Sequence, residues 1–120
     1  GVTLTHGMEH PVSGLKDIVH GKGLAALTPV VMAASIEGCP AKMAEISKRL
    51  GGMDENDLVA VIGSLLEKIG LTTSLSKLGV RPDDIEWMTD NCFKVSAAGI
   101  ANHPVTFDHE GIWKLYTEAM

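Results

Sequence analysis

Residues 1–21 read GVTLTHGMEHPVSGLKDIVHG, and this stretch contains three of the five histidines in a chain of 120 residues. His10 follows His6 by four positions, and His20 follows His6 by fourteen. If residues 2–10 are helical, His6 and His10 lie on one face of that helix. We expect the helix to end before Pro11, because the residue that precedes a proline is biased away from the helical conformation.

A loop around Gly14 and Lys16–Asp17 is then expected to return His20 to the neighbourhood of the first helix, near the start of a second one. A helical histidine and a histidine fourteen residues later can bind one metal ion, since imidazole suits zinc, iron, nickel and copper. The remaining histidine would serve proton transfer near neutral pH. The alternative is that these are ordinary surface or hydrogen-bonded histidines, but three within so short a stretch favour a functional role.

Composition indicates one domain that comprises residues 1–120. Hydrophobic residues make up 45% of the chain and aromatic residues only 4%, so we expect a core built mostly from aliphatic and methionine side chains. The formal net charge of -5, without a cluster of Lys or Arg, argues against nucleic acid or an anionic membrane surface as a partner. Cys39 and Cys92 are not spaced as metal ligands, and we expect both to be reduced.

The sequence predicts neither a secretory leader nor a membrane span, and we therefore expect a cytoplasmic location. The longest apolar run, residues 24–36, includes Thr28 and Pro29 and is shorter than the roughly 20 residues that cross a bilayer. The chain begins with Gly1 inside an expected helix, which is typical of a fragment of a larger protein.

The spacing of apolar residues predicts an all-α helical bundle, because no run of alternating residues is long enough for a sheet. A helix that is apolar on all sides is expected to be buried, and residues 22–37 have this character. Further helices are expected at 40–50, at 54–69 with Asp54 as N-cap, at 73–78, from Pro82 to about residue 94, and from Thr106 or Asp108 to the end. Residues 95–107, which include His103, are expected to form a connection, and we assign His103 no role.

Two motifs compete for the histidines. His6-Gly-Met-Glu9-His10 fits H-x-x-E-H, a zinc peptidase signature in which both histidines bind zinc and the glutamate is the general base. This match is short, and the third ligand would have to be a distant acid such as Glu86. The second motif is much longer. It combines residues 6–14 with Asp17-Ile-Val-His20-Gly21 and with residues 24–32, LAALTPVVM.

With every gap in place over these residues, the longer motif resembles the iron-containing (group III) alcohol dehydrogenases. The resemblance implies the all-helical C-terminal domain of the dehydroquinate synthase-like fold. It also implies that His6 and His20 are metal ligands for Fe(II) or Zn(II), and that His10 is not a ligand but a catalytic proton relay beside the nicotinamide. Glu9 is expected to face solvent or an ion-pair partner.

In the resembled family, an upstream Asp and His complete the metal site, and an N-terminal α/β domain binds NAD(P). Neither feature occurs in these residues, so we interpret the chain as the C-terminal metal-binding part of an NAD(P)-dependent alcohol or aldehyde oxidoreductase. Its partner would be a small alcohol or aldehyde, and a homo-oligomer is plausible. We expect the isolated chain to be inactive. The alternative is a catalytically inactive helical interaction or oligomerisation module derived from the same fold.

Overall fold

A computed structural model describes residues 1–120 and contains only helices and connecting turns. The prediction of an all-α fold is therefore confirmed. The α-helices are α1 (Leu4–Lys16), α2 (His20–Ser35), α3 (Pro40–Arg49), α4 (Leu58–Lys68), α5 (Ile85–Val95), α6 (Ala97–Ala101) and α7 (His109–Glu118). The 3-10 turns are η1 (Ile36–Gly38), η2 (Glu55–Asp57) and η3 (Pro82–Asp84). No helix is both long enough and apolar enough to cross a membrane.

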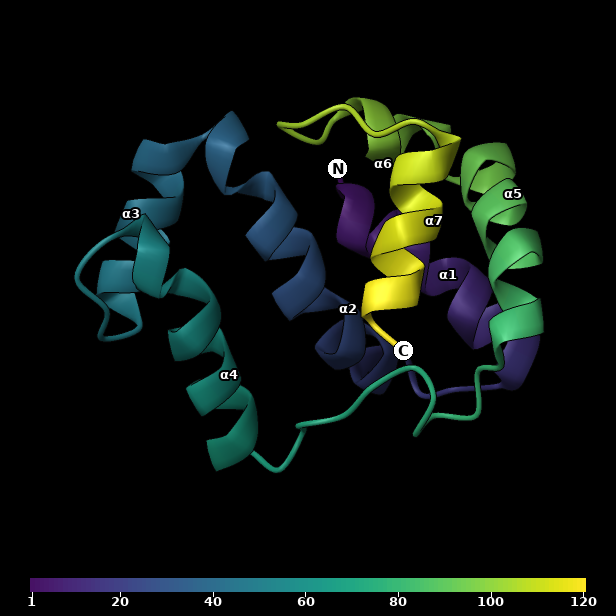
Figure 1. Ribbon diagram of the computed structural model, residues 1–120, viewed down its shortest axis with the longest axis horizontal. Coiled ribbons are helices and arrows are strands. Elements are labelled where there is room, and N and C mark those ends of the chain that lie inside the picture. Colours follow the sequence, from purple (N-terminus) through teal and green to yellow (C-terminus); the bar gives the residue numbers. More distant parts are fainter.

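The helix α1 lies at the centre of the larger part of the fold (Figure 1), in contact with α2, α5 and α6, while α7 packs against α2 and α5. These helices enclose a core of 16 buried residues, among them Leu4, Met8 and Val12 of α1. On the other side of α2, the pair α3 and α4 encloses a second, small core of Met43, Leu58 and Ile62.

The first helix is longer than its proline predicts. It continues through Pro11 to Lys16 and ends only at Asp17, whose φ of 51° lies in the left-handed region. A proline removes one backbone hydrogen bond from a helix interior, but Pro11 is buried in the packed part of α1, and this packing outweighs the local preference. At the far end, the Lys16 ammonium lies 2.7 Å from the Asp84 carboxylate, which joins α1 to the start of α5 and lowers the pKa of Asp84.

The other predicted helices lie close to their expected positions. His20 is the first residue of α2, Pro40 is the first residue of α3, and the side chain of Asp108 accepts a hydrogen bond from the Gly111 amide as the N-cap of α7. Asp54 caps a 3-10 turn that leads into α4, since its side chain accepts a hydrogen bond from the amide of Asn56.

Two segments differ from the prediction. Residues 73–78 form turns instead of a helix, although the Ser74 hydroxyl does accept a hydrogen bond from the Lys77 amide. The expected connection 95–107 contains the short helix α6. Helix α6 begins directly after α5 and packs on α1 through Gly7 and Gly99, so it depends on tertiary contacts that the local sequence does not reveal.

Candidate functional site

The structure brings the three N-terminal histidines together at one surface site. His6 and His10 lie one turn apart on α1, and His20 begins α2. The ring centres of His6 and His20 are 5.1 Å apart, those of His10 and His20 are 5.8 Å apart, and those of His6 and His10 are 6.2 Å apart. His6 is partly buried, whereas His10 and His20 are exposed. We call these three residues the histidine cluster.

A buried carboxylate lies behind the histidine cluster. The side chain of Glu9 is completely buried, and its Oε2 is hydrogen-bonded to Nδ1 of His20. Its Oε1 accepts a hydrogen bond from the Ser13 hydroxyl. The expectation that Glu9 faces solvent is therefore wrong, and the carboxylate instead faces a side-chain partner, His20. Because α1 continues past Pro11, Ser13 lies one turn after Glu9 and can bond to it, while the Glu9 side chain faces the first turn of α2.

The first turn of α2 approaches α1 closely at Gly23. A Cβ atom at this position would lie 2.4 Å from Oε1 of Glu9 and 2.8 Å from its Cγ, so only a glycine fits beside the carboxylate. The N-terminus of a helix also stabilises negative charge through the helix dipole. Gly23 and the N-terminus of α2 together form a tight enclosure for the Glu9 carboxylate.

The histidine cluster fits a metal ion that receives part of its ligands from this chain. Two imidazoles that bind one ion at a metal–nitrogen distance of about 2 Å have ring centres roughly 5 Å apart, which matches the pair His6 and His20. His10 is farther from both partners. No three donor atoms of the cluster lie within 4.8 Å of one another, so these residues alone do not form a closed site.

Three donor atoms do lie close together in a different, exposed cluster. Glu86 and Asp90 of α5 and His109 of α7 bring three donor atoms within 4.8 Å of one another, with Nε2 of His109 2.8 Å from Asp90 Oδ1. All three side chains are exposed, and the contacts of His109 account for their proximity, since it is hydrogen-bonded to Asp90 and lies 3.7 Å from Glu86 Oε1. Glu86 is thus engaged with His109, and the predicted alternative in which it completes a zinc peptidase site gains no support.

The remaining candidate residues are enclosed in the fold. His103 is buried, and burial lowers its pKa; its Nε2 lies 2.6 Å from the Ser35 hydroxyl. Cys39 and Cys92 are free, which agrees with the prediction of reduced thiols. Burial raises the pKa of Cys92 to about 11, so this thiol remains protonated at neutral pH and does not act as a thiolate ligand.

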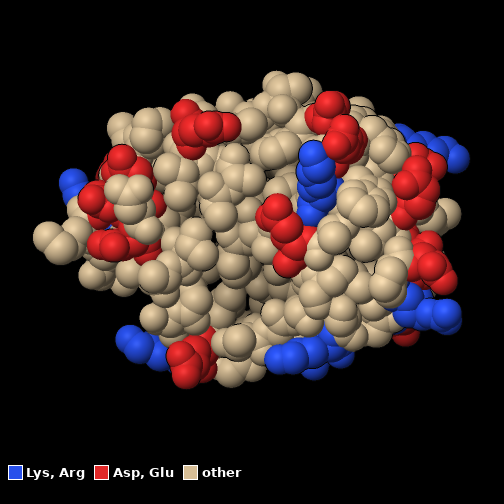
Figure 2. Space-filling view, in the orientation of Figure 1, with Lys and Arg blue, Asp and Glu red and all other residues tan.

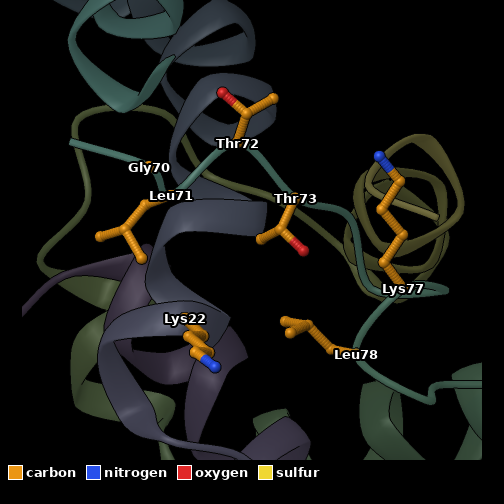
Figure 3. A pocket seen from close by; sticks show the side chains of 7 residues that line it. All are labelled: Lys22, Gly70, Leu71, Thr72, Thr73, Lys77 and Leu78. Carbon is orange, nitrogen blue, oxygen red and sulfur yellow. The ribbon is translucent and has the colours of Figure 1, made fainter. Parts of the chain in front are cut away.

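A pocket of about 280 Å³ lies beside the N-terminal part of α2 (Figure 3). Lys22 contributes to it from α2, and the other lining residues belong to the turns 70–78. None of the histidines lines this pocket. We nevertheless assign the candidate site to the histidine cluster, because imidazole side chains can bind a metal ion and transfer protons.

Figure 2 shows acidic and basic side chains scattered over one face of the molecule without a continuous basic area, as the composition predicts.

The sequence pattern described as the Fe-containing alcohol dehydrogenase family, C-terminal, matches residues 1–120. The chain belongs to this family. Its resemblance to the family is therefore confirmed, and so is the expected helical fold. The H-x-x-E-H alternative loses its basis for a second reason, because Glu9 is buried against His20 and Ser13 and cannot serve as an exposed general base.

Relatives within the family are alcohol dehydrogenases. The long-chain primary alcohol dehydrogenase AdhA of Thermoanaerobacter ethanolicus is 31% identical over 97% of this chain and 31% of its own length. The 1,3-propanediol dehydrogenase of Klebsiella pneumoniae is 32% identical over 74% of this chain and 25% of its own length. The chain thus spans about a third or less of these relatives.

Solved structures show the same arrangement of helices. The archaeal halo-thermophilic alcohol dehydrogenase from a Red Sea brine pool superposes with a TM-score of 0.90 at 30% identity, over 98% of this chain and 32% of that protein. A 1,3-propanediol oxidoreductase gives a TM-score of 0.88 at 27% identity, over 97% of this chain and 32% of that protein. The family's helical C-terminal domain is the fold of this chain.

Glu9 is the residue at the site whose importance the sequence analysis missed. From its sequence position, Glu9 was expected to face solvent or an ion-pair partner, and it was not connected with His20. The available signal was the pairing of an acid in the first helix with Gly23 in the second, but only the approach of the two helices connects these residues.

Proposed function

We propose that this chain is the metal-binding C-terminal part of an NAD(P)-dependent alcohol or aldehyde oxidoreductase. The observation that carries the proposal is the 5.1 Å separation of the His6 and His20 rings, within a family of iron-containing alcohol dehydrogenases. His6 and His20 would hold Fe(II) or Zn(II). A small alcohol or aldehyde would be the substrate.

The bound ion would supply Lewis-acid polarisation of the alcohol oxygen, and NAD(P) would accept the hydride. The chain's own residues would bind the ion and move the proton. His10 is exposed and its ring centre is 5.8 Å from that of His20, so it can exchange protons with solvent from a position beside the ion. An imidazole suits this task because its ordinary pKa lies near neutrality.

Two histidine ligands leave the other coordination positions of the ion to residues outside this 120-residue sequence. NAD(P) would likewise be bound mainly by residues outside it. We therefore expect weak metal binding and no dehydrogenase activity from the 120 residues alone. The same two-ligand geometry also favours a second candidate function, an inactive helical interaction module derived from the fold. Exposed apolar side chains such as Val19 and Met53, with 67% and 81% exposure, would suit self-association in either case, and a cytoplasmic location fits both.

A cobalt(II) titration of the purified chain tests the proposal. We expect His6→Ala and His20→Ala each to weaken binding by at least about tenfold, as loss of a ligand should cost no less than loss of a supporting residue. His10→Ala should leave the affinity unchanged. His109→Ala is the matched control, because it removes the only histidine of the exposed Glu86–Asp90–His109 cluster.

Other results would contradict the proposal in distinct ways. Binding that requires His6 and His10 but not His20 would favour the H-x-x-E-H motif. Binding that is lost only in His109→Ala would move the site to α5 and α7, and no binding at all would favour the inactive module. NAD(P)-linked turnover by the isolated chain would contradict the expected inactivity.

A further inference from the structure

We infer that Glu9 is a positioning residue that fixes the tautomer and orientation of His20, so that Nε2 of this histidine is presented to the metal ion. The inference rests on the proposed function, in which His20 is a ligand. It assigns a role to a buried carboxylate that makes no contact with substrate in the proposed mechanism.

The contrast in burial between the two partners is the first observation. The Glu9 side chain has no exposed surface, whereas the His20 side chain is 46% exposed. Burial of a carboxylate is unfavourable unless hydrogen bonds compensate for the lost water. Glu9 has two such partners, the Ser13 hydroxyl and His20 Nδ1. The carboxylate thus holds one side of an imidazole ring whose other side faces outward.

The hydrogen-bonding chemistry determines which ring nitrogen is available. An ionised carboxylate only accepts hydrogen bonds, so Nδ1 of His20 must be the donor in this contact. In the neutral imidazole, the lone pair is then on Nε2. A carboxylate that accepts a hydrogen bond from one ring nitrogen, while the other binds metal, is a common way to orient a histidine ligand and raise its basicity.

Gly23 provides the second, independent observation. The glycine lies in the first turn of α2, three residues after His20, and a Cβ there would approach Glu9 Oε1 to 2.4 Å. The space beside the carboxylate is therefore closed to any larger side chain. By contrast, a Cβ at Gly21 in the same turn would meet nothing within 4 Å. The chain thus offers two neighbouring glycines, of which only one touches the carboxylate.

A purely structural ion pair between α1 and α2 is the competing interpretation. An imidazolium in such a pair carries a proton on both ring nitrogens, whereas our inference requires a neutral ring with its proton on Nδ1. Side-chain ¹H–¹⁵N NMR of the metal-free chain should therefore show a proton on Nδ1 of His20 and none on Nε2. In Glu9→Leu, which replaces the carboxylate by an apolar side chain of similar size, the proton should redistribute between the two nitrogens. This readout is independent of any metal.

Cobalt(II) affinity is the second readout. We expect Glu9→Leu and Gly23→Ala to weaken cobalt binding by about 10- to 100-fold, the usual effect of removing a partner of a metal ligand. Glu9→Gln, which retains an acceptor for Nδ1, should restore part of the affinity lost in Glu9→Leu. Gly21→Ala and the exposed-site variant Glu37→Gln are the matched controls and should bind like the wild type. Thermal unfolding of each variant checks that it folds.

The outcomes separate the inference from the proposed function. Folded Glu9→Leu with an unchanged tautomer and unchanged cobalt affinity would overturn the inference, and Glu9 would be a structural ion-pair partner only. If the wild-type chain binds no cobalt, the proposed function fails, and NMR still decides whether Glu9 sets the tautomer of His20. Equal losses in Gly21→Ala and Gly23→Ala would also overturn the inference, because the effect would not arise at the carboxylate.

Discussion

His103 and His20 show how the nearest neighbours of a histidine determine its chemistry. Nδ1 of His20 faces the Glu9 carboxylate, whereas Nδ1 of His103 is buried without a hydrogen-bond partner. The Ser35 hydroxyl, which donates to the Val31 carbonyl, lies beside Nε2 of His103. A proton on Nδ1 of His103 would therefore be a buried donor without an acceptor, and burial lowers the pKa of this histidine. The same residue type is thus suited to a metal site in one place and to the neutral core in another.

This difference predicts a loss of stability in mild acid. Because folding lowers the pKa of His103 from its ordinary value of 6.5, the unfolded chain binds a proton more readily below about this pH, and the free energy of unfolding should fall as the pH decreases from there. His103→Gln keeps a donor for Ser35 but does not titrate, so its stability should decline less between pH 7 and pH 5. Urea unfolding at several pH values measures this, and parallel curves for the two proteins would contradict it.

At the scale of the elements, α1 has two functions on two faces. One face contributes Leu4, Met8 and Val12 to the main core, and another carries two of the clustered histidines. The buried Tyr116 hydroxyl of α7 donates a hydrogen bond to the Met8 carbonyl at 2.5 Å. This contact joins the first and last helices, and it holds the helix that carries His6 and His10 in place against the core.

Tyr116→Phe should destabilise the chain by about 1 kcal/mol, because it removes one buried hydrogen bond and preserves the ring. Equilibrium urea unfolding gives the free energy directly. Thr117→Val is the matched control on the same helix, since the exposed Thr117 hydroxyl bonds only to the Trp113 carbonyl of its own helix; it should change the stability by less than about 0.5 kcal/mol. An equal effect of both substitutions would show that the Tyr116 hydrogen bond contributes nothing specific.

At the scale of the whole molecule, the two cores differ greatly in size. The main core contains 16 buried residues, and the core between α3 and α4 contains three. The histidine cluster lies on α1 and α2, which both contribute to the main core. Since local opening is easiest where few apolar contacts must be broken, the fold places its candidate site on the more stable part.

Hydrogen exchange should reveal this difference. We expect the amides of α3 and α4 to exchange faster than those of α1, α2 and α7, through an opening that leaves the main core intact. Native-state exchange at increasing low concentrations of urea, followed by mass spectrometry or NMR, measures the opening free energies. A single opening free energy for all these helices would mean that the two cores unfold as one unit.

Much of the fold could be predicted from the sequence because its signals are local. Pro40 at the start of α3 and Asp108 at the N-cap of α7 are places where backbone chemistry alone decides a boundary. The spacing of apolar residues likewise predicted α4. The prediction was wrong where packing outweighs local preference, as at Pro11, and where a short helix depends on its neighbours, as in α6.

The sequence by itself determined the all-helical class, the family resemblance and the positions of His6, His10 and His20, because these depend on residue type and spacing along the chain. Only the tertiary structure decided that the rings of His6 and His20 lie 5.1 Å apart and that Glu9 is buried behind His20. The physical reason is that a carboxylate's burial and the partner of a ring nitrogen depend on how closely two helices approach. At Gly23, that approach leaves no room for a Cβ atom.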